Sequence, residues 1–363
     1  MLQTQDTKLW SPVSSRTHPI EQLLNLAPKE ILERMFREQR HSFEQFLSSD
    51  EIPMSSIFPG MMFGIANAKG GAAVRIRDSI ARERLLHLFG EFHTHVMMHP
   101  VWVHPFFCRF SEGYFTSGQL AVFGQNYFNQ VKNTRQCVAR ALGRLHSHTD
   151  LGYGDLDSWV SEAIQKVLAH LLADEYGVSC QEDLEDQPPA DIAEMFAVKT
   201  HGALYRDFLN GIGIFGGAQD VAMLPSVAAN TRRQLELSGD PGYSVLEALA
   251  SVGLGMEWGV PAFFSMIISG LKKHEVRNGR SFDASTLEIW SAHVRQDVAH
   301  AISVFVVTAM LIHTDDDVIA VKRSTDILME CRYDMMTELH QVVFGEIVPS
   351  YGEMVNMVRA EIK

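Results

Sequence analysis

The sequence has few cysteines and no excess of basic residues, and both absences exclude classes of protein. Four cysteines occur in 363 residues and none forms a C-x2-C pair, so neither a zinc ribbon nor a disulfide framework is indicated. Acidic residues outnumber basic ones and the formal net charge is −13. Because nucleic acid and anionic membranes attract basic surfaces, we expect neither as a partner.

Long apolar runs are also missing. The longest, Ala301–Ile312, is too short to cross a membrane, and the first 20 residues lack a basic stretch followed by an apolar core. We therefore expect a cytoplasmic protein with no membrane association.

Strand signals and internal repeats are absent, whereas helical periodicity recurs along the chain. A hydrophobic content of 46% with 21% charged residues is ordinary for a globular protein. These observations predict an all-α helical bundle. The expected helices cover about 19–48, in two parts meeting near Pro28, and 74–99, 104–111, 119–145, 155–176, 195–209, a short segment after Pro225, 243–273 with a kink at Pro261, 290–307, 326–343 and 346–362. Loops are expected at 1–20, 52–73 and 178–190. We expect two parts, an N-terminal helical extension over residues 1–95 and a main domain over 96–363.

One helix carries metal-ligand chemistry. Within W-S-A-H-V-R-Q-D-V-A-H-A, His293, Asp297 and His300 stand at i, i+4 and i+7 and fall within about 60° of arc on one helical face. Imidazole and carboxylate together suit iron, manganese or zinc. The other interpretation is that these three polar residues share a face of a surface helix by chance.

Further acidic and imidazole groups stand on otherwise apolar helices. Glu257 lies in L-G-M-E-W-G, and a carboxylate among apolar neighbours needs a partner such as a metal. Glu175 and His201 lie on either side of an acidic loop. Six such groups would satisfy two iron ions. The ferritin-like plan uses two E-x2-H motifs, but only Glu38 with His41 matches it, so that plan is not expected.

Together, these segments resemble the heme-oxygenase-like diiron oxygenases, also called iron-containing redox enzymes. The resemblance runs from about His104 to Val307. It is carried by H-P-F-F, by D-E-Y-G followed by K-T-H-G-A-L-Y-R-D-F-L-N-G, by the lone glutamate and by H-V-R-Q-D-V-A-H. It implies a heme-oxygenase-like bundle that binds two Fe ions (Fe2+/Fe3+), uses O2 as co-substrate and forms a homodimer, with an external electron donor as a further partner. The implied iron ligands are Glu175, His201, Glu257, His293, Asp297 and His300.

The chain departs from the family pattern at the first glutamate, because an acidic insertion separates Glu175 from His201. Glu194 stands seven residues before His201 on the same helical face, so it could replace Glu175 or join it as a seventh ligand. D-E-Y-G is the better match to the family pattern, which favours Glu175.

By this resemblance, we expect a non-heme diiron oxygenase that N-oxygenates a small amine or amino-acid-derived metabolite in natural-product biosynthesis. One alternative is oxidative C–C cleavage or decarboxylation of an amino acid or fatty acid at the same site. Another is a non-catalytic helical binding protein with a structural metal site. Cofactorless relatives such as the thiaminase-type and pyrroloquinoline quinone-forming enzymes share the architecture but have no need of six metal ligands.

The sequence gives less support for a functional role of other histidines and arginines. The offsets of His93, His95, His99 and His104 do not place them on one helical face, so we expect structural or surface roles. His104 is the formal candidate for a proximal heme ligand, but heme binding is not expected. The arginines at 140, 144 and 206 could anchor a substrate carboxylate or pair on the surface.

Overall fold

The computed structural model describes residues 26–48, 71–146, 149–177, 199–216 and 222–361. Within these ranges every regular element is a helix, so the predicted all-α bundle is confirmed. The expected polar start, most of the loop expected at 52–73, the acidic loop at 178–190 and Glu194 lie outside the described residues.

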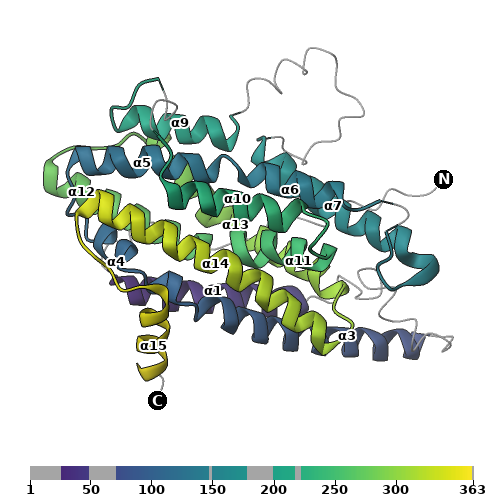
Figure 1. Cartoon of the computed structure of the whole chain (residues 1–363). Coiled ribbons are helices and arrows are strands. Elements are labelled where there is room, and N and C mark those ends of the chain that lie inside the picture. Colours follow the sequence, from purple (N-terminus) through teal and green to yellow (C-terminus); the bar gives the residue numbers. More distant parts are fainter. Residues whose placement is uncertain (1–25, 49–70, 147–148, 178–198, 217–221, 362–363) are drawn as a thin grey trace, which may run out of the picture.

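Figure 1 shows how the helices are arranged in the described part of the chain. Their bounds are α1 (Pro28–Ser48), α3 (Gly71–Met97), η3 (Pro100–Val103), α4 (Pro105–Ser111), α5 (Ser117–Val131), α6 (Thr134–Gly143), η4 (Gly154–Leu156), α7 (Asp157–Glu175), α9 (His201–Gly211), α10 (Pro225–Gly239), α11 (Val245–Ala250), η8 (Ser251–Glu257), α12 (Val260–Asn278), α13 (Ala284–Met310), α14 (Asp315–Phe344) and α15 (Tyr351–Glu361).

Helix α13 lies in the middle of the bundle (Figure 1). It packs against α12, α9, η8 and α7, and its side chains Trp290, Val304 and Phe305 are completely buried. Polar groups on this helix are therefore enclosed by protein, where an unpaired charge is costly. The position of α13 thus determines the environment of every ligand candidate that it carries.

The stretch Val245–Asn278 forms a second core element, a long helical stretch whose regular hydrogen bonding changes just before Pro261, near the expected kink. After α11 the chain makes a π-helix, η8, and α12 begins only at Val260. Pro261 therefore stands in the first turn of a new helix, where its missing N–H is not needed. The stretch is long and apolar enough to cross a membrane, but its apolar window is wholly buried, as in the core helix of a soluble protein.

The N-terminal helices share the core of the main domain. Gln39 of α1 donates a hydrogen bond to the backbone carbonyl of Trp258 at 2.6 Å, and Trp258 Nε1 donates to His93 Nδ1 of α3 at 3.0 Å. Phe43 packs edge-on against Phe305, with ring centroids 5.3 Å apart. These contacts tie the expected extension to the helices that carry the ligand candidates, while the boundary at residue 95 stays a prediction.

Two helices are longer than their periodicity predicts. Helix α14 begins at Asp315, eleven residues before the expected start, because Thr314 caps it and Asp317 completes a capping box. Helix α10 runs over Pro225–Gly239 rather than one or two turns. A capping box at the start of α14 and a proline at the first position of α10 favour helix where the apolar stripe alone does not predict it.

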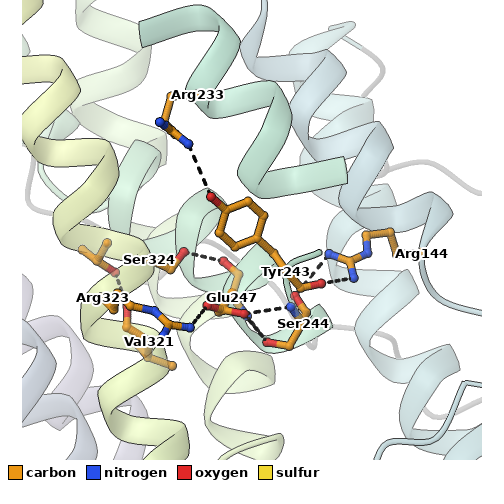
Figure 2. Close-up of polar contacts among 9 residues, drawn as sticks. Arg144, Arg233, Tyr243, Ser244, Glu247, Val321, Arg323 and Ser324 are labelled. Atoms are coloured by element: carbon orange, nitrogen blue, oxygen red, sulfur yellow. Dashed lines mark hydrogen bonds and ion pairs between the residues drawn. The ribbon is translucent and has the colours of Figure 1, made fainter. Parts of the chain in front are cut away.

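Helix α11 is fixed at its start by a buried glutamate, Glu247 (Figure 2). The N–H of Ser244 donates to its carboxylate at 2.8 Å and the Ser244 hydroxyl does so at 3.0 Å. Arg323 of α14 forms an ion pair with the other carboxylate oxygen at 2.5 Å, and Ser324 donates to the Glu247 carbonyl at 2.8 Å. The capping box therefore also attaches α11 to α14.

Candidate metal centre

The three ligand candidates on α13, His293, Asp297 and His300, belong to two separate groups of residues. Glu175, His201 and His293 form the outer group, in which single ligand atoms from each residue lie within 4.8 Å of one another. Glu257, Asp297 and His300 form the inner group under the same criterion. Because His293 and Asp297 are four residues apart, the groups are offset by about 6 Å along α13. The structure thus gathers all six residues implied by the resemblance.

The outer group draws on three helices. Glu175 is the last residue of α7, His201 the first of α9, and His293 lies on α13. His201 Nδ1 lies 3.1 Å from Glu175 Oε1, and the His201 and His293 rings have centroids 4.5 Å apart. His293 Nδ1 donates to the carbonyl of Ile289 at 2.6 Å, which leaves its Nε2 free to bind a metal.

The inner group has an additional carboxylate that sequence reasoning missed. His300 Nε2 donates to Asp174 Oδ2 at 2.8 Å, while His300 Nδ1 lies 3.4 Å from Asp297 Oδ1. Asp174 also pairs with His170 Nδ1 at 3.4 Å, one turn earlier on α7. A carboxylate behind a ligating histidine fixes its tautomer and orientation, here with Nδ1 toward the inner group. The D-E-Y-G motif contains Asp174, but only the fold brings it to His300.

The π-helix presents Glu257 to the inner group. π-helical turns are rare and often occur at functional sites. Gly253 and Gly255 allow the segment to lie close to its neighbours, since a Cβ would lie 2.6 Å from Val304 Cγ1 at the first position and 2.6 Å from Leu328 Cδ2 at the second. A side chain at Gly253 would press η8 away from Val304 of α13, and one at Gly255 would require the Leu328 side chain of α14 to move.

Several buried polar atoms of the two groups make no well-formed hydrogen bond with a described residue, although His201 Nδ1 and His300 Nδ1 each lie within ion-pair distance of a carboxylate. They are both carboxylate oxygens of Asp297, Nδ1 of His300 and Nδ1 of His201. Buried polar groups are normally satisfied, and leaving one unpaired costs about 1–3 kcal/mol. These buried atoms lack good hydrogen bonds and contact mainly one another, and positive ions between them would satisfy them, so the residues fit a pair of divalent metals.

The electrostatics without metal agree with this fit. Burial, followed by the charge of Asp297, holds the pKa of Glu257 well above its usual range. Burial alone would lower the pKa of His300, but its hydrogen bonds with Asp174 and Asp297 raise it to about 10. For Glu175, the bond with His201 outweighs burial and lowers the pKa. The raised pKa values of Glu257 and His300 favour their protonated forms in the absence of metal, and both residues would lose a proton on binding an ion.

A pocket opens onto the outer group. It encloses about 340 Å3 of empty space, including open solvent, and no residue of the inner group is part of its lining. Its lining residues are Phe128, Val131, Lys132, Thr134, Arg135, Glu175, His201, Gly202, Tyr205, Ile289 and His293. The aromatic residues expected to be core are mostly buried, but Phe128 and Tyr205 also form a wall of this pocket.

The arginines considered as carboxylate anchors do not line this pocket. Arg144 donates to the carbonyls of Tyr243 and Ser244 (Figure 2), and Arg140 donates to the carbonyl of Leu235 at 3.1 Å. Arg206 is exposed. The positive charges at the pocket are instead Lys132 and Arg135, for which no sequence pattern stood out.

The four histidines between residues 93 and 104 have structural or surface roles, as expected. His104 is completely buried, its Nδ1 accepts from the N–H of Phe106 at 3.0 Å, and its Nε2 contacts Thr337 Oγ1 at 3.1 Å. With both nitrogens engaged, it is not available as a heme ligand. His93 and His99 likewise have hydrogen bonds at both nitrogens, and His95 pairs with Asp326.

Comparison with known proteins shows little. No protein-family model and no curated protein matches the chain. Among solved structures, a TenA homologue from Pseudomonas syringae pv. tomato is similar with a TM-score of 0.47 at 10% sequence identity, over 72% of this chain and 92% of the other. The assignment of a function therefore depends on the two ligand groups and the pocket.

Proposed function

We propose that the protein is a non-heme diiron, O2-dependent oxygenase that acts on a small nitrogen-containing metabolite. The observation that supports this most is the outer group, which offers two histidines and one carboxylate to a metal beside an open pocket. Such a set with free coordination positions is typical of non-heme Fe(II) oxygenases. The inner group lies one helical turn away and supplies ligands for a second ion.

Each residue has a role that follows from its contacts. Glu175, His201 and His293 would hold the ion next to the pocket, and Glu257, Asp297 and His300 would hold the other. Bound iron would supply O2 activation, which ordinary side chains cannot provide. The carbonyl of Ile289 and the carboxylate of Asp174 orient His293 and His300, and the Phe128 and Tyr205 side chains line the pocket at the outer group.

Metal analysis is the first test. Purified protein reconstituted anaerobically with Fe(II) should hold about two iron ions per chain, as expected of a bundle-core dimetal site, and its iron should be oxidised on mixing with O2. His293→Ala should lose metal, whereas His87→Ala, whose side chain is 79% exposed, should not. Less than one iron per chain would instead favour a binding protein with a satisfied polar core or a structural metal.

The reaction needs a separate test. We favour N-oxygenation because the N-terminal helices and overall size suit the larger members of the family that the sequence resembles. The alternative, oxidative C–C cleavage or decarboxylation, uses the same ligands. A panel of small amines and amino acids should give products that gain oxygen; products that lose carbon would support the alternative.

A further inference from the structure

The pocket beside the outer group carries two positive side chains from one short stretch of chain. Lys132 follows α5 and Arg135 lies in the first turn of α6, and both line the pocket together with Glu175 and His201. We propose that Lys132 and Arg135 bind the carboxylate of a short-chain substrate and direct its other end to the outer group. The binding of the carboxylate does not depend on the proposed function, but the placement of the other end of the substrate at a metal ion does.

Neither positive charge is neutralised within the part of the chain that the structure describes. Lys132 Nζ donates to the neutral amide oxygen of Asn129 at 2.9 Å. The Arg135 guanidinium lies over the ring of Tyr176, with its carbon 5.5 Å from the ring centroid. Both residues are half-buried, which strengthens their attraction for an anion relative to fully exposed charges.

Arg135 also lies close to a ligand candidate. A Cβ at Gly202 would be 3.4 Å from Arg135 Nη1, so the guanidinium rests on the first turn of α9 beside His201. The missing side chain at Gly202 therefore leaves room for the guanidinium. A bidentate bond between guanidinium and carboxylate has a fixed geometry, so it would orient a substrate as well as hold it.

Two helix starts add to the positive potential. Helix α6 begins at Thr134 and α9 begins at His201, and both first residues line the pocket. Free N–H groups and the helix dipole make a helix start favourable for anions.

The rest of the wall identifies the kind of anion. Phe128, Val131, Tyr205 and Ile289 line the same pocket as the two cations and His293, and their side chains are largely apolar. A carboxylate on a short carbon chain fits this arrangement, because its charged end meets the cations while its chain contacts the apolar wall. Inorganic phosphate could use the cations but not the wall.

Binding of hexanoate, its neutral isostere hexanamide and inorganic phosphate to the metal-free full-length protein tests the proposal. Metal-free protein is used because a carboxylate could otherwise bind iron directly. Calorimetry should show hexanoate binding about ten-fold or more tighter than hexanamide, the difference expected for a charged hydrogen bond. Lys132→Met and Arg135→Met should each reduce that preference, and together should abolish it.

The control is Lys166→Met, which removes an exposed lysine of α7 outside the pocket lining and should keep the preference. The proposal is overturned if wild-type protein does not prefer hexanoate, if the double variant keeps the preference, or if phosphate binds and hexanoate does not. Loss of the preference in the double variant, combined with less than one iron per reconstituted chain, would support the carboxylate site and reject the diiron function.

Discussion

Two buried glutamates stand ten residues apart on one helical stretch, and their surroundings are opposite. The carboxylate of Glu247 accepts hydrogen bonds from Ser244 and pairs with Arg323 (Figure 2). Glu257 has no hydrogen bond or ion pair with any residue that the structure describes; it faces Asp297 and His300 instead. Both side chains are at least 95% buried.

The pKa values of the two residues move in opposite directions. Burial would raise that of Glu247, but the Ser244 and Arg323 bonds outweigh it and lower the pKa. Burial and the nearby Asp297 raise the pKa of Glu257. A buried carboxylate with partners stabilises the fold, whereas one without partners requires something that the chain does not supply. This difference distinguishes a structural glutamate from a candidate ligand.

Removing the unpartnered carboxylate should have the largest effect on metal binding. Glu257→Gln should weaken iron binding at the inner group by about 100-fold or more, because loss of a ligand exceeds the 10–100-fold effect of changing an outer partner. Competition with a chelator measures this. Without metal, the variant should unfold at the same or a higher temperature. Unchanged iron affinity would remove Glu257 from the ligand set.

Changing the carboxylate behind His300 should have the next largest effect. Asp174→Asn keeps the shape but weakens the bond that orients His300, so iron affinity should fall by about 10–100-fold. Asp155→Asn, at an exposed position just before α7, is the matched control. Equal affinities in the two variants, measured by the same competition, would show that Asp174 does not position a ligand.

The π-helix can be tested through its glycines. Gly253→Ala places a Cβ 2.6 Å from Val304 Cγ1 in the buried core, and overpacking of this kind costs about 1–3 kcal/mol. Gly118→Ala is the control, because its Cβ would meet no atom closer than 3.8 Å. Urea unfolding should separate the two variants. If Gly253→Ala is as stable as the control, close packing of η8 on α13 does not hold Glu257 in place.

The smallest effect is expected at the partnered glutamate. Glu247→Gln should lower the free energy of unfolding by about 1 kcal/mol at neutral pH and leave iron binding unchanged. Because the folded pKa of Glu247 lies below 4.5, its contribution is complete above that pH and is lost as the pH falls through the lowered pKa. Wild type and variant should therefore converge in urea unfolding at about pH 3. A difference that persists in acid would contradict this account.

Much of the fold follows from local signals in the chain. The apolar stripes of α5, α7 and α13 predict helices close to those observed, and Gly177, expected to end α7, has a φ of 72°. The long α14 and the π-helix were missed, because a cap and close glycine packing decide them rather than apolar spacing.

For the candidate site too, part was predictable from the sequence and part depends on the packing of helices. Spacing alone places His293, Asp297 and His300 on one face, and an apolar neighbourhood alone marks Glu257 as needing a partner. Spacing does not show that His293 belongs to the outer group with Glu175 and His201. Nor does it show that Asp297 and His300 belong to the inner group with Glu257. That division depends on how α7, α9 and η8 pack around α13.

From the sequence alone come the helical class, the location of the ligand candidates, and the expectation of no zinc ribbon, no disulfide framework and no basic surface for nucleic acid. These depend on composition and on periodicity within single helices. Only the tertiary structure pairs Asp174 with His300 across 126 residues and places Lys132 and Arg135 beside His201. The physical reason is that such contacts arise from packing between distant helices, which leaves no periodic pattern within the chain.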